Sequence, residues 1–352
     1  MAATPGVLRG RPVRLAMMIL ALVLAATGAT LYFSGAYDDW RDGRALSRAC
    51  DGILPQDELP QLLDWDGRLT SDEAWSLTAR DARTCTVYSP ELEDHNNTQL
   101  SLTVSQGRGS RQLLTDLAVI DERETVTPIG NGWRGILNVQ SELPKATVVM
   151  PCGKKPDDAL VVHLETWSGP YDNDSAGQRA RLARVVTQAA ANAADQAGCD
   201  AAPGERVERV PGELIKRSDT PKPAGTATGT CRDVPAPALE TAADPLAPIE
   251  NCVLKDRTGH PSDRLTAYYG PFVQHGHADL GIADSARFAK HPAGSIDGLS
   301  WASADCPKQG GPAFFTAQSL PGSDADLPAG AFKQFALRSA KGHGCEVPVF
   351  SN

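Results

Sequence analysis

The 352-residue chain contains none of the short motifs that mark the common enzyme active sites. It has no GxSxG nucleophile elbow, no HExxH zinc motif, no GxxxxGK(S/T) phosphate loop and no GxGxxG loop after a predicted strand. CxxC and CxxH pairs are also missing, so the cysteines do not have the spacing of a compact zinc site. These absences favour a binding or interaction protein over an enzyme, and we expect no cofactor.

Positive charge is scarce, with 34 Lys and Arg against 43 Asp and Glu and a net charge of −9. The first 34 residues contain Arg9, Arg11 and Arg14 and no acidic residue, so residues 35–352 carry −12. A surface this acidic is repelled by a phosphate backbone. Nucleic acid is therefore not an expected partner.

No charged residue interrupts Leu15–Ser34, LAMMILALVLAATGATLYFS. Twenty apolar residues are enough for a helix to cross the hydrocarbon core of a membrane. Arginines precede the segment, while Asp38, Asp39 and Asp42 follow it, and basic flanks stay on the cytoplasmic side. The sequence thus predicts a single-pass protein of the cell membrane, with a cytoplasmic tail at 1–14, a transmembrane helix at 15–34 and everything after it outside.

Cleavage of the same segment as a signal peptide is the alternative. Ser34-Gly35-Ala36 has the small-x-small form of a cleavage site, although the apolar run is longer than the 7–15 residues of a usual signal core. The length favours a retained signal anchor, and cleavage after Ala36 stays open.

None of the cysteines lies in or before the apolar segment. The eight are Cys50, Cys85, Cys152, Cys199, Cys231, Cys252, Cys306 and Cys345. An even number confined to the exported side predicts disulfides formed in an oxidising compartment. Buried free thiols or a metal site are the alternatives.

Residues 35–200 have the pattern of an α+β domain. We expect strands near residues 83–89, 99–106, 132–139, 146–150 and 159–165, and helices at 110–120 and 175–197. The last helix has an alanine-rich apolar stripe suited to close packing on a sheet, and Gly198-Cys199 ends it. Residues 201–230 then have the Pro, Gly and Thr content of a linker.

Residues 231–352 repeat the order of features. A cysteine-bearing strand around Cys252 precedes expected strands at residues 264–274, 301–306 and 313–320, and a helix at 327–344 ends in Gly344-Cys345. The predicted fold is α+β with two tandem units, each an antiparallel sheet with flanking helices, preceded by one transmembrane helix. One domain with similar ends by coincidence is the alternative.

The duplication also predicts the pairing of the cysteines, which spacing alone does not fix. The linker separates four cysteines from four, so we expect bridges within each unit. The expected pairs are Cys50–Cys85, Cys152–Cys199, Cys231–Cys252 and Cys306–Cys345. With no bridge across the linker, the two units are expected to fold independently.

The start of the first unit, ACDGILPQDELPQLL, is followed some 35 residues after its cysteine by the strand CTVY. This order resembles secreted actinobacterial lipoproteins of unknown function, whose exported domain begins with a Pro-Cys-Leu-Leu-like helix and a Cys-aromatic strand. The chain differs in having Ala49 where a Pro is usual and in having no lipobox. The resemblance implies a PsbP-like fold and a place at the cell surface, and it implies no activity.

The chain offers two weak candidate sites for chemistry. On a strand, His275 and His277 would face one way and share a metal with Asp279, although a solvated loop is commoner for such a sequence. His163 and Glu165 would share a strand face as an acid/base couple, and a surface contact is again commoner.

Two aromatic loops, 167–171 and 268–272, have the residues of a binding surface or of a core rim, and the core rim is favoured. Two functions from different classes follow. The first is a non-catalytic binding or interaction protein whose partner is an extracytoplasmic protein or a cell-wall ligand. The alternative is an extracytoplasmic metal-dependent or acid/base hydrolase that uses His275, His277 and Asp279. The lack of catalytic motifs favours the first.

Overall fold

The structure is a computed structural model of the whole chain. It describes residues 15–24, 36–63, 65, 67–75, 82–90, 98–107, 110, 113–114, 125–138, 143–153, 158–167, 175–212, 219–279, 291–296, 298–309, 311–323 and 326–351. Among these residues, no helix is long and apolar enough to cross a membrane. Residues 15–24 of the predicted span are helical, and its remaining residues, 25–34, lie outside the described part of the chain.

Short helices open the first unit. Helix α2 (Ala36–Leu46) packs beside the strand Thr70–Trp75, and η1 (Ala49–Gly52), η2 (Gln56–Glu58) and α3 (Leu59–Leu63) follow it. Leu59, Leu62 and Leu63 are buried in the core of the first unit. The leucines of this opening segment therefore help to form the core of the first unit.

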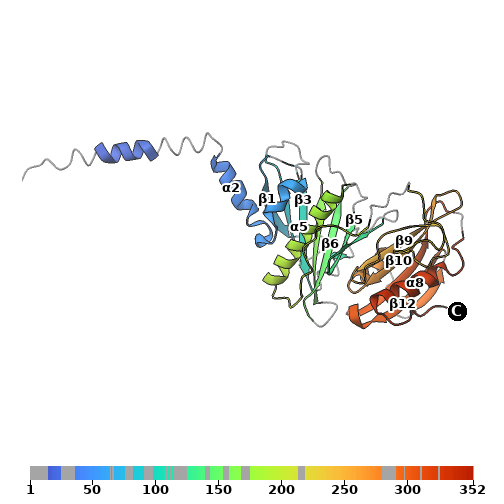
Figure 1. Cartoon of the computed structure of the whole chain (residues 1–352). Helices are drawn as coiled ribbons and strands as arrows, with labels where there is room; N and C mark the ends of the chain where they lie inside the picture. The colour runs from blue at the N-terminus through green and yellow to red at the C-terminus, as the bar shows by residue number, and fades with distance from the viewer. Residues whose placement is uncertain are drawn as a thin grey trace, which may run out of the picture.

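That sheet is antiparallel and has seven strands. They are β1 (Thr70–Trp75), β2 (Ala82–Tyr88), β3 (Thr98–Gln106), β4 (Thr127–Gly130), β5 (Trp133–Asn138), β6 (Lys145–Pro151) and β7 (Ala159–Thr166), in the order β1-β2-β3-β7-β6-β5-β4. Helix α5 (Ala176–Gln196) lies across it (Figure 1) and buries Leu182, Val185, Val186 and its alanines. Small alanine side chains let the helix approach the sheet closely, as the sequence predicts.

The second sheet is also antiparallel. It contains β8 (Ala238–Glu240), β9 (Ile249–Lys255), β10 (Pro261–Tyr269), β11 (Ala293–Ile296), β12 (Leu299–Cys306) and β13 (Gly311–Ser319), in the order β11-β12-β13-β10-β9-β8. Helix α8 (Ala331–His343) covers one face (Figure 1) with Phe335, Ala336 and Ala340. The chain is thus α+β with two antiparallel sheets.

The two sheets share one topology. Read from its other edge, the second is β8-β9-β10-β13-β12-β11, which matches β1-β2-β3-β7-β6-β5 of the first, and β4 is the added strand. In each unit a helix follows the strand that pairs with the third strand: α5 follows β7, which pairs with β3, and α8 follows β13, which pairs with β10. The repeated order of features therefore corresponds to a repeated strand order.

The helix ends repeat as well. Gly198 and Gly344 both adopt positive φ, 66° and 70°, and the next residue is a cysteine. The amide of each cysteine donates to the carbonyl five residues earlier, Cys199 to Ala194 and Cys345 to Ala340, both at 2.9 Å. This is the Schellman ending, for which glycine is suited because it has no Cβ.

All eight cysteines form disulfides, in the four pairs expected from the sequence: Cys50–Cys85, Cys152–Cys199, Cys231–Cys252 and Cys306–Cys345. In each unit one bridge ties the opening segment to the second strand and the other ties the end of the helix to the sheet. The prediction of bridges within each unit is confirmed.

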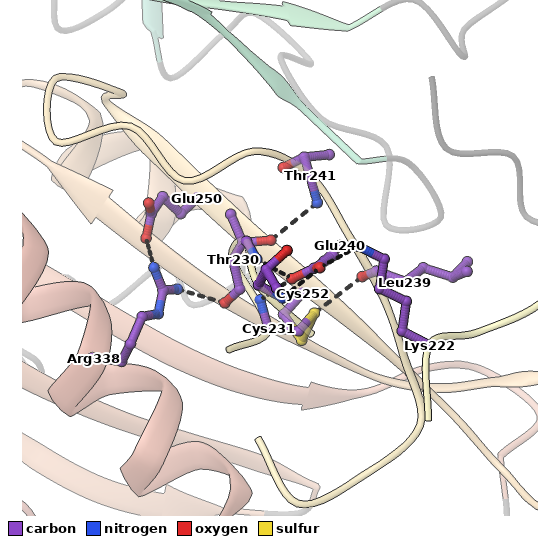
Figure 2. Close-up of a disulfide and its surroundings, with 11 residues drawn as sticks. Lys222, Thr230, Cys231, Leu239, Glu240, Thr241, Glu250, Cys252 and Arg338 are labelled. Atoms are coloured by element: carbon purple, nitrogen blue, oxygen red, sulfur yellow. Dashed lines mark hydrogen bonds and ion pairs between the residues drawn. A yellow bond between two sulfur atoms is a disulfide. The ribbon is translucent and has the colours of Figure 1, made fainter. Parts of the chain in front are cut away.

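Figure 2 shows how the bridge Cys231–Cys252 is surrounded. The buried Glu240 carboxylate accepts bonds from Lys222 Nζ (2.7 Å) and from three backbone amides, those of Thr228, Gly229 and Cys231, at 2.6–3.2 Å. Burial acts to raise the pKa of Glu240, but the Lys222 bond and the three amides outweigh it and the pKa is lowered. Glu240 thus holds the segment before the second sheet in place.

The sequence missed four strands and misplaced one element. Strands β1, β4, β8 and β11 have three to six residues, too few for a periodic signal. The strand expected at 264–274 ends at Tyr269, because Gly270 takes a positive φ and helix α6 (Phe272–Asp279) begins after Pro271. The helix expected at 110–120 lies mostly outside the described residues.

The sheets also pack against each other through the faces that α5 and α8 leave open. A buried cluster combines Ile136, Val149 and Val161 of the first sheet with Tyr268, Trp301 and Phe314 of the second. The Val126 amide, just before β4, donates to Asn251 Oδ1 in β9 at 3.3 Å. Helix, sheet, sheet and helix therefore follow one another as four layers.

The segment between the units also contacts the first sheet. Val207 and Val210 belong to the first core, and the Trp133 indole donates to the Glu205 carbonyl at 2.8 Å. Gly204 lies against Trp133, where a Cβ would come within 2.5 Å of the ring. Residues 201–212, placed in the linker by composition, thus run along β5.

Candidate functional site

A cleft of about 290 Å³ lies where the two units meet. Its walls are mostly apolar, and they come from Val149 and Pro151 of the first unit and from Leu246, Pro248, Pro271 and Pro307 of the second. Its polar groups are Arg134, Lys308 and Gln309. Among the residues that the structure describes, those lining the cleft include no Asp or Glu, although the chain as a whole carries −9.

Arg134 is the half-buried cation of this cleft. It lies on β5, and its guanidinium donates to Gln309 Oε1 and, at 3.4 Å, to the Lys308 carbonyl, both of which are neutral acceptors. Within the described residues, no carboxylate forms an ion pair with Arg134 or Lys308. Burial lowers the pKa of the Arg134 guanidinium.

Arg134 is held by a fixed partner. Gln309 Nε2 donates to the Pro245 carbonyl at 2.8 Å, which orients the amide so that its oxygen faces Arg134. Gln309 and Lys308 belong to the short helix η4 (Pro307–Gln309), directly after Cys306, and the Cys306–Cys345 bridge ties that turn to the end of α8. The disulfide thus fixes one wall of the cleft.

The ring of Tyr269 closes the cleft on the side of α8, and its hydroxyl is already engaged. It shares a 2.5 Å hydrogen bond with Ser339, whose hydroxyl also donates to Glu250 at 2.6 Å, and Glu250 pairs with Arg338 at 3.0 Å. Burial, and then the charge of Glu250, raises the pKa of the Tyr269 hydroxyl well above its ordinary value. Tyr269 therefore stays neutral and serves as a wall.

His275 and His277 do not lie on a strand, so their side chains are not placed on one face as the sequence analysis expected. His275 and His277 lie on helix α6, where residues two apart point in different directions. His275 is buried, and its Nδ1 donates to the Leu114 carbonyl at 2.7 Å. The rings of His277 and Phe314 pack in a T-shaped arrangement with their centroids 4.5 Å apart. Burial lowers the pKa of His277.

Asp279 is the last residue of the same helix. No group of three metal-ligating side chains is found among the described residues.

His163 and Glu165 do form a pair, at 3.2 Å, and the other His163 ring nitrogen bonds the Thr147 hydroxyl at 2.8 Å. Hydroxyl, imidazole and carboxylate in a row is the connectivity of a hydrolase triad. However, Thr147 and His163 are 1% and 2% exposed, on the face of the first sheet that points toward the second. Substrate has no access to a hydroxyl buried in this way, so the row stabilises the inner face.

The environment of Glu165 predicts that the stability of the fold falls measurably in acid. Burial acts to raise its pKa, but the hydrogen bond and charge of His163 and the charge of Lys145, 3.3 Å away, lower it to about 2. A lowered folded pKa gives stability that is present above the unfolded value near 4.5 and is lost as the pH falls toward 2.

We expect Glu165→Gln to cost about 1–2 kcal/mol at pH 7 and to flatten the loss of stability between pH 4.5 and 2. Urea unfolding at stepped pH measures both. Glu208→Gln, at an exposed ion pair with Arg206, is the control and is expected to change neither. If the Glu165 variant lost stability between pH 4.5 and 2 as steeply as the parent, Glu165 would not be the group responsible.

The aromatic loop at 268–272 belongs to the core: Tyr268 and Phe272 are fully buried in the cluster between the sheets. The other aromatic loop lies mostly outside the described residues, apart from the exposed Trp167. The sequence analysis did not find the cleft. The one signal in the sequence was Arg134, the single charged residue of the strand WRGILN, since a charge within a buried strand needs a reason.

Comparisons of the chain with protein-family models, with curated proteins and with solved structures find no match.

Proposed function

We propose that this chain is a single-pass, membrane-anchored extracytoplasmic protein that binds a partner at the cleft between its two sheets and performs no chemistry on it. The observation that carries the compartment is the pairing of all eight cysteines in four disulfides. Four bridges in one chain are typical of proteins that mature in an oxidising compartment. The resemblance of ACDGILPQDELPQLL to secreted actinobacterial lipoproteins supports the same location.

The exposed face of α2 supports an anchor next to the membrane. Tyr37 and Trp40 are 51% and 57% exposed, and Arg44 lies 5.3 Å from the Trp40 ring. The opposite face of α2 carries Asp42, which pairs with Arg68 and is buried. Tyr and Trp are enriched at the membrane–water interface, and this face begins three residues after the apolar segment ends.

The cleft supports binding without catalysis. Its polar groups are two cations and an amide, and the Tyr269 hydroxyl beside it is neutral and engaged. Acid/base and covalent catalysis require a general base or an activated nucleophile, and the described lining residues include neither. Such a set of groups is suited to holding an anion.

A reporter enzyme that is active only outside the membrane tests the topology. We expect activity when the reporter follows Asn352 and none when it follows Pro12, because the arginines keep the N-terminus inside. The full-length chain should remain with the membrane fraction during carbonate washing. The reverse pattern of reporter activity would refute the proposed location, and recovery of a soluble form starting at Tyr37 would mean that the anchor is removed.

A further inference from the structure

We propose that the cleft binds a small organic anion, an apolar body that carries one carboxylate, with the carboxylate held by Arg134 and Lys308. This inference names the ligand class of the site in the proposed function and rests on that site being a binding site. Three properties of the cleft carry it: its charge, the way its cations are held, and its walls.

The charge of the cleft is opposite to that of the chain. In the described part of the chain, two cations line it and no carboxylate does, and the protein has a net charge of −9. Arg134 is half-buried with neutral acceptors alone, an arrangement in which much of the desolvation cost of its charge is not repaid. The Asp158 carboxylate lies beside Gly153, which lines the cleft, but Asp158 is not itself a lining residue. An anion from outside would give Arg134 the charged partner that no described residue supplies.

The Arg134 guanidinium is held before any ligand arrives. Gln309, fixed by the Pro245 carbonyl, accepts from Nη1 of Arg134, and the Lys308 carbonyl accepts from Nη2, so the guanidinium plane is set while other N–H groups remain for a ligand. Lys308 lies against Gly344, where a Cβ would come within 2.8 Å of its side chain. Groups held in this way bind at a lower entropic cost.

The walls select the body of the ligand. Pro151, Pro248, Pro271 and Pro307 have no backbone N–H, so these parts of the wall have no amide to donate to a sugar or to several phosphates. Val149 and Leu246 add apolar surface. A volume of about 290 Å³ is at the small end for ligand sites, which fits an aromatic ring or a short branched chain with one acidic group.

The first experiment compares three probes by isothermal titration calorimetry with the full-length chain in lipid nanodiscs. Phenylacetate has the proposed chemistry, 2-phenylethanol has the same ring without the charge, and inorganic phosphate has the charge without the ring. We expect phenylacetate to bind with a Kd below about 1 mM and at least tenfold more tightly than either of the others. Equal binding of 2-phenylethanol or of phosphate, or no binding of phenylacetate, would overturn the proposal.

The second experiment assigns the site. Arg134→Gln keeps a side chain that can bond Gln309 and is expected to weaken phenylacetate binding at least tenfold, because it removes a charge-assisted hydrogen bond. Lys308→Glu, at an exposed position where folding is not in question, should abolish binding by charge reversal. Arg209→Gln, at an exposed arginine outside the cleft, is the matched control and should bind as the parent does.

Unchanged binding in both cleft variants would place the ligand elsewhere and refute the assignment. The reporter fusions test a different property: outside location without phenylacetate binding would refute the ligand class alone. A cytoplasmic location would refute the proposed function whatever the cleft binds.

Discussion

Removing the bridge that ties α5 to its sheet, by Cys152→Ala with Cys199→Ala, is expected to lower the free energy of unfolding by about 4 kcal/mol. The two cysteines are 47 residues apart, and closing a loop of this length in the unfolded chain has an entropic value of that size. Both side chains are only partly buried, so their replacement leaves little cavity. The loss is a large share of the 5–15 kcal/mol that stabilises a typical protein. Differential scanning calorimetry should show a shift of the melting temperature on the order of 10 °C.

The equivalent bridge of the second unit, removed by Cys306→Ala with Cys345→Ala, provides a parallel comparison. Its cysteines are 39 residues apart, so a loss of similar size is expected. Because the cluster around Phe314 joins the sheets, each variant should lower the same single transition. A variant in which half of the protein melts at the original temperature would contradict this and would favour independent units, as the sequence alone suggested.

The sequence analysis reached the disulfides because the repeat limits how cysteines can pair. Gly198-Cys199 and Gly344-Cys345 end their helices in the same way, and the order of strands around Cys85 and Cys252 is the same. Local features of this kind depend on neighbours in the chain. Such features can be predicted from the sequence without knowing which elements pack against each other.

The packing of the two sheets against each other could not be predicted from the sequence in the same way. Tyr268, Trp301 and Phe314 are apolar in the sequence whether they face a helix or another sheet, and β9 and β10 are buried on both faces. A strand covered on both sides loses the alternation that identifies a surface. The cleft depends on this packing, since Arg134 and Gln309 are 175 residues apart, and so it could not be predicted.

The histidines of α6 are a second case in which tertiary structure was needed to place the side chains. His275-Gly-His277 was interpreted on a strand, where the period of two places the side chains together. Pro271 and the turn at Gly270 begin a helix instead, which turns the side chains apart. Gly276 is needed there because a Cβ would come within 2.6 Å of the Tyr268 ring. The glycine between the histidines thus serves the contact between helix and sheet.

Phe314 and Phe315 allow the two packing surfaces of one strand to be compared directly. They are neighbours on β13, 1% and 0% exposed, and they point to opposite faces. Phe314 lies in the cluster between the sheets, near His277 and Tyr268, while Phe315 packs under α8 beside Tyr269. Substituting either by Ala is expected to cost about 3–5 kcal/mol, because each leaves a cavity of the same size. The consequences for cooperativity should differ.

Phe315→Ala weakens the core of the second unit, so the whole protein should still unfold in one transition at a lower denaturant concentration. Phe314→Ala weakens the surface that joins the units, so unfolding in urea should separate into two steps, each with a smaller m-value than the parent transition. Tryptophan fluorescence follows both units, because Trp133 lies in the first and Trp301 in the second. One sharp transition with an unchanged m-value in Phe314→Ala would contradict this, because it would show that the sheets remain coupled without the Phe314 ring. Since the walls of the cleft come from both units, the same variant should also lose phenylacetate binding while Phe315→Ala retains it in the folded state.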